Sequence, residues 1–98
     1  MNTDQTKQAF VDLLLDAGST FGAQFAETPA ELAQYMAERA EHLSRISGEP
    51  GFELAVEAEQ DAIALRAGLI VSDSTRVVDQ RIWGLIGGAL RIAALALV

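Results

Sequence analysis

Apolar residues recur along this chain at the spacing of an α-helix, and clusters of glycine, proline and serine interrupt the pattern. The first segment starts near Thr3 or Asp4, and its apolar positions follow a 4-3-4-4 spacing that lines one helix face. These positions are Phe10, Leu14, Ala17, Phe21 and Phe25. Gly18 lies inside the pattern and costs about 1 kcal/mol relative to alanine, so we expect the first helix to bend or end there.

The second segment has the clearest helix start in the sequence. Thr28 is placed to cap the helix, Pro29 to occupy its first position, and Glu31 to complete a capping box. The apolar residues that follow mark its buried face: Leu32, Met36, Leu43 and Ile46. Ser47 and Gly48 are expected to end the helix.

The third segment runs from Pro50 to about Val71 and is apolar over much of its circumference, so we expect a central helix. Its apolar positions include Val56, Ile63, Leu65, Leu69 and Ile70. A fourth helix is predicted after residues 72–74, with a 4-3-4-3-4 ladder typical of lengthwise helix packing: Val78, Ile82, Leu85, Ala89, Ile92 and Ala96. The sequence leaves open whether these segments form one helix or two, and it also permits a short β-hairpin from 69–71 and 77–78.

Together these patterns predict an all-α protein of three to four helices, arranged as an antiparallel helical hairpin or bundle in a single domain, 1–98. The chain has 98 residues, and a folded domain of this size buries only about 60–65% of the surface that its unfolded chain exposes. A monomer would therefore be marginally stable, and we expect the bundle to be oligomeric.

Composition removes several classes of chemistry. The chain has no cysteine and one histidine, which excludes disulfides, iron–sulfur and thiolate zinc sites, and metal sites that need two histidines. A net charge of −7 argues against general nucleic-acid binding, which requires a basic surface. Residues 1–61 carry −9 and residues 62–98 carry +2. The two parts would attract each other, within one chain or between copies, unless the acids simply form a solvated surface.

No group of residues matches a catalytic, cofactor-binding or metal-binding motif, so we predict that the protein is not an enzyme. His42 shares a helix face with Glu38, but di-iron bundles use Glu-x-x-His supplied twice, and a surface histidine is the simpler interpretation. Acids at alternate positions diverge on a helix and suit only its first turns; they are Glu57, Glu59 and Asp61. The glycines of the fourth segment lack the preceding strand and the pattern of a phosphate loop.

A stripe on the fourth segment is the first feature that points to a partner. Its members share one helix face: Arg81, Gly84, Gly88, Arg91 and Leu95. Gly84 and Gly88 remove side chains where another backbone would approach, within the chain or between chains, and such contact would offset the cost of two glycines. Alternatively, Arg81 and Arg91 flank a recess for an anionic ligand or an acidic partner. Helix–helix contact is the most economical account of the stripe, and for the arginines we prefer pairing with Glu57, Glu59 or Asp61 to such a recess.

The apolar stretch 82–98 is the second such feature. It contains a single charge, Arg91, and as a helix it spans about 25 Å, short of the roughly 30 Å of a bilayer core. A central charge adds about 2.5–3.5 kcal/mol to insertion, so a helix buried in a bundle is favoured over a tail anchor or a holin-like span. The N-terminal sequence, Met-Asn-Thr-Asp-Gln, lacks the regions of a signal peptide, and we expect a cytoplasmic protein.

In style the chain resembles small accessory proteins of bacteriophages and prophages, which are short, alanine-rich, acidic, helical and free of cysteine. The resemblance is strongest from Ser47-Gly-Glu-Pro-Gly-Phe to the C-terminal Arg-Ile-Ala-Ala-Leu-Ala. It implies a bacterial or viral cytoplasmic setting, and a role either as a structural part of a particle or as a small inhibitor of host machinery. No functional residue is carried over from it.

We therefore predict a non-enzymatic helical interaction protein that self-associates through its C-terminal helices, as an assembly component or as an inhibitor that binds another protein. The expected association residues are Val78, Ile82, Gly84, Leu85, Gly88, Ala89, Ile92 and Ala96. No cofactor, metal or nucleic acid is expected. The alternatives are a small membrane-associated protein that uses residues 82–98, and an oligomeric anion- or nucleotide-binding protein that uses Arg81 and Arg91.

Overall fold

The computed structural model describes residues 3–22, 24–68 and 80–97. Within these ranges four helices follow one another: α1 (Thr3–Phe21), α2 (Pro29–Ser44), α3 (Phe52–Arg66) and α4 (Gln80–Ala96). No strand occurs in the described ranges, which confirms the predicted all-α class for that part of the chain. The hairpin considered at 69–71 and 77–78 lies outside the described residues.

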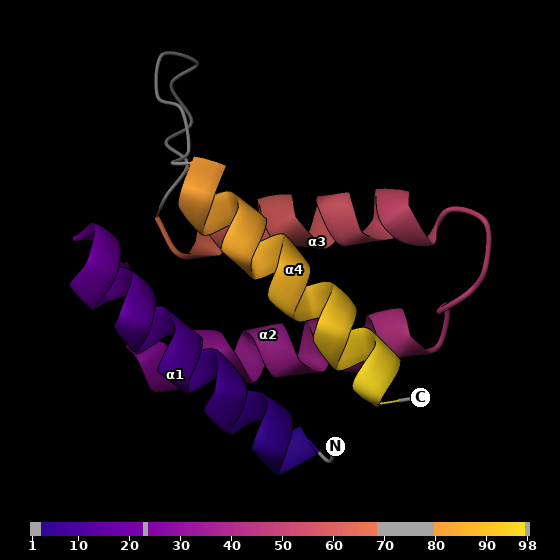
Figure 1. The fold of residues 1–98 in the computed structure, drawn as a ribbon, viewed down its shortest axis with the longest axis horizontal. Helices are drawn as coiled ribbons and strands as arrows, with labels where there is room; N and C mark the ends of the chain where they lie inside the picture. Colours follow the sequence, from indigo (N-terminus) through magenta and orange to yellow (C-terminus); the bar gives the residue numbers. More distant parts are fainter. Residues whose placement is uncertain (1–2, 23, 69–79, 98) are drawn as a thin grey trace.

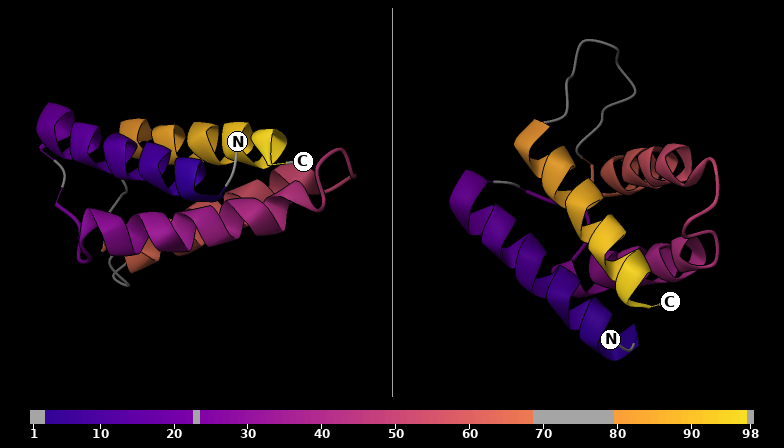
Figure 2. Two further views of the ribbon diagram at one scale, coloured as in Figure 1. Left: turned by 90° about the horizontal axis from the view of Figure 1, so that it is seen from below. Right: turned by 45° about the vertical axis from the view of Figure 1, so that its right-hand side comes forward.

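The helices lie in two layers (Figures 1 and 2). α2 and α3 run antiparallel in one layer, and α1 and α4 run antiparallel to each other in the second layer, diagonally across the first. The molecule measures 35 × 27 × 18 Å. Because α1 and α4 share a layer, the start of α1 and the end of α4 lie near each other at one end of it.

α2 is the central helix and packs against each of the other three. Its six buried residues include three alanines, and small side chains allow helices on several sides to come close. The sequence pattern predicts that the third helix is central, but α3 is peripheral, with Leu54 72% exposed and Leu65 60% exposed. Apolar residues surround α3 instead of forming one stripe, so its pattern does not show how little of it the core covers.

Thr28 caps the start of α2 as predicted, but only the first half of the capping box forms, because Glu31 accepts from the Thr28 hydroxyl and not from the Thr28 backbone N–H. The backbone N–H of Glu31 donates to Thr28 Oγ1 (3.2 Å), and Thr28 Oγ1 donates to Glu31 Oε1 (3.1 Å). The predicted apolar face of α2 is buried through Leu43. The helix ends at Ser44, a few residues earlier than its sequence signal, and turns connect it to α3.

α1 continues through Gly18 and ends at Phe21. The predicted apolar positions up to residue 17 are buried, and their burial outweighs the cost of one glycine in a helix. Gly22 has φ +67°, a left-handed conformation that turns the chain out of the helix. Phe25 therefore lies in the connection to α2, partly buried against the core, and not on α1.

The face of α4 that packs against the core differs from the face that the predicted ladder defines. The buried positions are Ile82, Ile86, Leu90, Ala93 and Ala94. Leu85 and Ile92, which belong to the predicted ladder, are 40% and 68% exposed, and Val78 lies outside the described residues. Because α4 is apolar around most of its circumference, several lines at helical spacing compete, and spacing alone cannot select the one that packs on α2.

Ion pairs link α3 to α2 and to the connection before α2. Arg39 of α2 donates two hydrogen bonds to the carboxylate of Glu59, with 2.7 Å between Nη2 and Oε1. Arg66 Nε donates to Glu27 Oε1, in the connection before α2, at 2.8 Å. Hydrogen bonding to Glu59 raises the pKa of Arg39 above its ordinary value. These ion pairs add to the packing of α3 through buried side chains such as Val56 and Ile63.

Candidate interaction surface

Exposed apolar side chains gather on the outer face of α4. Among the described residues six large apolar side chains are exposed, and three of them, Leu85, Ile92 and Leu95, lie on this helix. With Gly88 they follow a 3-4-3 spacing, so they form one line on the side away from the core. We call this line, Leu85, Gly88, Ile92 and Leu95, the α4 stripe.

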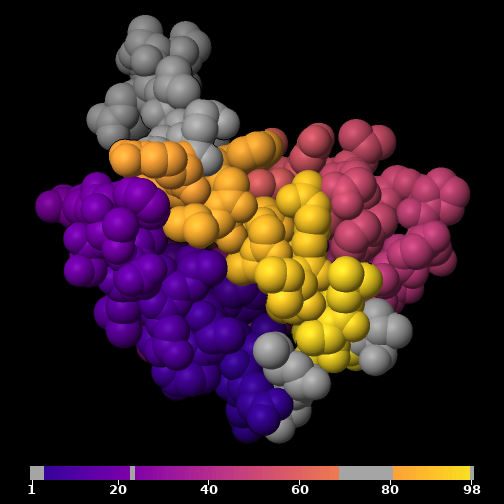
Figure 3. Space-filling view, in the orientation of Figure 1, coloured from indigo at the N-terminus to yellow at the C-terminus, as the bar shows by residue number. Residues whose placement is uncertain are grey.

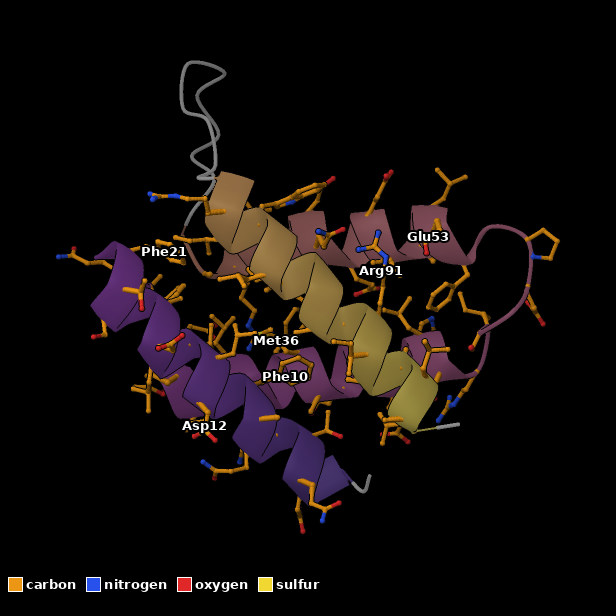
Figure 4. All side chains as sticks on the ribbon, viewed as in Figure 1. Phe10, Asp12, Phe21, Met36, Glu53 and Arg91 are labelled. Carbon is orange, nitrogen blue, oxygen red and sulfur yellow. The ribbon has the colours of Figure 1, made fainter. Side chains whose placement is uncertain are left out.

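A groove lies between α1 and α4, beside the α4 stripe. Its lining is apolar apart from Thr6 and consists otherwise of Ala9, Phe10, Leu13, Ala89, Ile92 and Ala93. Figure 3 shows the two helices side by side on one face of the molecule, and Figure 4 shows the Phe10 ring between them. The groove has a volume of about 150 Å³. An engineered cavity of about that volume binds benzene, whereas small-molecule sites usually measure about 300–1,000 Å³. The groove therefore fits one large apolar side chain.

The α1 edge of the groove is acidic. A shallower depression continues from the groove toward Leu85, and its lining includes Asp12 and Asp16. Both carboxylates are exposed, and Gln8 Nε2 donates to Asp12 Oδ1 at 3.0 Å. Among the described residues neither aspartate forms an ion pair. Figure 4 shows Asp12 on the outer side of α1.

The opposite edge of α4 carries Arg91, which is paired with Glu53 of α3 (Figure 4). Arg91 Nη2 and Nε donate to Glu53 Oε2 at 2.7 and 2.9 Å. The hydrogen bonds from Arg91 hold the pKa of Glu53 below its ordinary value, and the same bonds raise the pKa of Arg91. Glu57, one turn along α3, adds to that rise. This edge therefore presents one cation and two carboxylates.

The arginines singled out by the sequence have neighbours within the chain that differ from those predicted. Arg91 pairs with Glu53 and not with Glu57, Glu59 or Asp61, and Figure 4 shows it reaching from α4 toward Glu53 in the first turn of α3. Glu59 is occupied by Arg39. The guanidinium of Arg81 lies over the ring of Phe21, 4.7 Å from its centroid.

The glycine that makes a close contact within the chain is Gly87, not Gly84 or Gly88. A Cβ added at Gly84 or Gly88 would meet nothing within 4 Å. At Gly87 it would lie 2.1 Å from Nε2 of Gln60, a buried side chain that donates to Trp83 O at 3.0 Å. Contact between chains at Gly84 and Gly88 stays a prediction.

The other predicted association residues divide between core and surface. Ile82 is only 3% exposed and belongs to the core, so it is unavailable to a partner of the folded chain. Leu85 and Ile92 are exposed, and Ala89 and Ala96 are half-buried beside them. Of these four, Leu85, Ala89 and Ile92 belong to the α4 stripe or to the groove, and Ala96 belongs to neither.

The histidine and the acidic residues singled out by the sequence do not form a cluster in residues 3–22, 24–68 and 80–97. No three metal-binding side chains gather there, and His42 is exposed on α2. Glu57 and Asp61 are exposed on α3, while Glu59 is taken up by its ion pair. None of the described helices combines the length and the apolar character needed to cross a membrane.

Comparison with protein-family models, with curated proteins and with solved structures gives no match. The functional assignment therefore depends on the surface itself. Sequence reasoning missed the contribution of α1, although a signal was present: Ala9 and Leu13 widen the buried line of Phe10 and Leu14 toward one side. That side faces α4.

Proposed function

We propose that this chain is a non-enzymatic helical interaction protein whose contact surface is the α4 stripe together with the groove beside it. The observation that carries the proposal is the exposure of Leu85, Ile92 and Leu95 in one line on a helix. Single exposed leucines are ordinary in proteins, whereas a continuous apolar line beside a groove is typical of a protein-binding surface.

The size of the surface indicates that stripe and groove act together. Complete burial of a leucine or isoleucine side chain is worth about 1.5–3 kcal/mol, while association costs about 4–15 kcal/mol in lost translational and rotational freedom. Leu85, Ile92 and Leu95 are already partly buried in the free chain, so their complete burial alone does not offset the upper part of this range. An anchor seated in the groove against Phe10 and Leu13 supplies further apolar burial.

The proposal takes two forms. Self-association through α4 would make the chain an assembly component, and binding of a different protein would make it an inhibitor or accessory factor. In either form Gly88 leaves a gap between Leu85 and Ile92, and a side chain of the partner fills it as a knob fills a hole.

Ile92→Asp, matched with the control Leu54→Asp, tests the proposal. The two side chains are 68% and 72% exposed, so both variants are expected to fold, and only Ile92 belongs to the surface. Two properties would be measured for each protein. The first is the mass by light scattering over a wide concentration range, and the second is binding of a fluorescent amphipathic helical peptide with one leucine face and uncharged flanks.

We expect Ile92→Asp to abolish the association that the wild-type chain shows, with itself or with the peptide, and Leu54→Asp to leave it unchanged. The proposal is wrong if the wild-type chain keeps a mass of 10.5 kDa at every concentration and binds no peptide. It is also wrong if both variants weaken association equally, because the stripe would then have no special role.

A further inference from the structure

We infer that the groove between α1 and α4 binds an amphipathic helix of another protein, which seats one large apolar side chain in the groove and presents lysine or arginine to the α1 edge. This inference rests on the proposed function and deepens it, because it states the chemistry of the partner.

The shape of the site suits a helix. α1 and α4 lie side by side with antiparallel axes (Figure 1), and each packs mainly on α2 and only lightly on the other. A third helix aligned with both can lie along the channel between them, as amphipathic helices do in apolar grooves. Leu13 on one wall and Ile92 on the other would contact its apolar face.

The acidic edge determines which side chains flank the anchor. Asp12 and Asp16 are four residues apart, so they border the depression beside the groove from successive turns of α1. Among the described residues they have no cationic partner. At the far edge of α4, Arg91 is held by Glu53 and lies near Glu57, which leaves that edge net negative as well. A helix with cationic flanks complements both edges.

The same charges disfavour a second copy of this chain as the occupant. If two α4 stripes pack antiparallel about a two-fold axis, both α1 helices lie on the same side of the pair. Asp12 and Asp16 of one copy would then approach those of the other, on bodies that each carry a net charge of −7. Like charges repel, so the face selects a basic partner over its own copy.

The test uses the full chain and two designed peptides that share one leucine face, one with lysine flanks and one with glutamate flanks. Affinities would be measured by fluorescence anisotropy. Asp12→Lys/Asp16→Lys reverses the charge of the α1 edge. Glu49→Lys/Asp61→Lys changes the net charge equally at exposed positions outside the groove and serves as the control.

We expect the lysine peptide to bind at least about tenfold more tightly than the glutamate peptide, a difference of about 1.4 kcal/mol. Asp12→Lys/Asp16→Lys should reverse this preference, and the control should retain most of it. The preference should shrink between about 0.1 M and 1 M salt, because the Debye length falls from about 10 Å to about 3 Å. Ile92→Asp should remove binding of both peptides.

Three results would overturn the inference while the proposed function stands. The first is equal binding of both peptides that Ile92→Asp abolishes. The second is a mass that is a multiple of 10.5 kDa and falls to 10.5 kDa in Ile92→Asp, because a second copy would then occupy the groove. The third is an equal loss of preference in Glu49→Lys/Asp61→Lys, which would show general attraction to an acidic chain. A monomer that binds neither peptide would overturn both proposals.

Discussion

Gly84 and Gly87 lie one turn apart on α4, and an added methyl group would meet different surroundings at each. At Gly84 the space is open, with nothing within 4 Å, so alanine gains helix propensity without a clash. At Gly87 the methyl group would collide with the amide of Gln60, which is buried and bonded to Trp83 O. Replacement by alanine should therefore have opposite effects on stability at the two positions.

We expect Gly84→Ala to raise the free energy of unfolding by up to about 1 kcal/mol, the propensity difference between the two residues. Gly87→Ala should lower it, by up to about 2 kcal/mol, because overpacking costs about 1–3 kcal/mol and outweighs the propensity gain. Urea unfolding of both variants would measure the difference, with the wild-type chain as reference. A rise of similar size in both would show that Gln60 moves aside freely.

Residue-scale features are predictable from the sequence where the partners are neighbours in the chain. The N-cap contact of Thr28 with Glu31 joins residues three apart, so the local pattern is sufficient to place it. The contact of Gly87 depends on Gln60, a residue of another helix. Spacing within α4 could not show which of its glycines would face that side chain.

On the scale of one element, the ion pair of Arg91 with Glu53 adds an electrostatic contribution to the attachment of α3 to α4. The folded-state pKa of Glu53 lies below its ordinary value of 4.5 because Arg91 donates hydrogen bonds to the carboxylate. A lowered pKa contributes stability that is fully present above the ordinary pKa and is lost as pH falls through the folded-state pKa. The contribution is small, since both groups are partly or largely exposed.

Glu53→Gln tests this attachment. At neutral pH we expect the variant to unfold at a lower urea concentration than the wild-type chain, because it lacks the ion pair. As pH falls below 4.5, the two midpoints should converge, since the wild-type carboxylate is then protonated. A midpoint difference that persists unchanged to acid pH would mean that the side chain acts through packing and not through charge.

At the scale of elements, the sequence predicted which segments form helices, but it did not predict for every helix which side faces the core. The described residues contain four helices, where the sequence predicted three to four and left open whether the last two segments were separate. The core-facing side was predictable in α2, where polar residues oppose the apolar line, and not in α4, where apolar residues surround the helix. For the same reason the sequence predicted α3 as the central helix, a position that α2 occupies.

On the scale of the whole molecule, ion pairs within the chain neutralise part of the uneven charge along the sequence. Two ion pairs, Arg66 with Glu27 and Arg91 with Glu53, join the basic part of the chain to the acidic part. They leave Asp12 and Asp16 without a cationic partner in the described residues. Composition could give the net charge, but only the fold shows that this unpaired charge borders an apolar groove.

Removal of that charge should therefore change how copies of the chain meet. In Asp12→Asn/Asp16→Asn the apolar surface is unaltered while the repulsion between two α1 edges is reduced, so we expect self-association at lower concentrations than in the wild-type chain. Light-scattering mass over a wide concentration range would measure it. Ile92→Asp, added to this variant, should restore the monomer. Glu49→Gln/Asp61→Gln lowers the net charge equally away from the groove, and an equal effect there would mean that overall charge, and not the α1 edge, keeps copies apart.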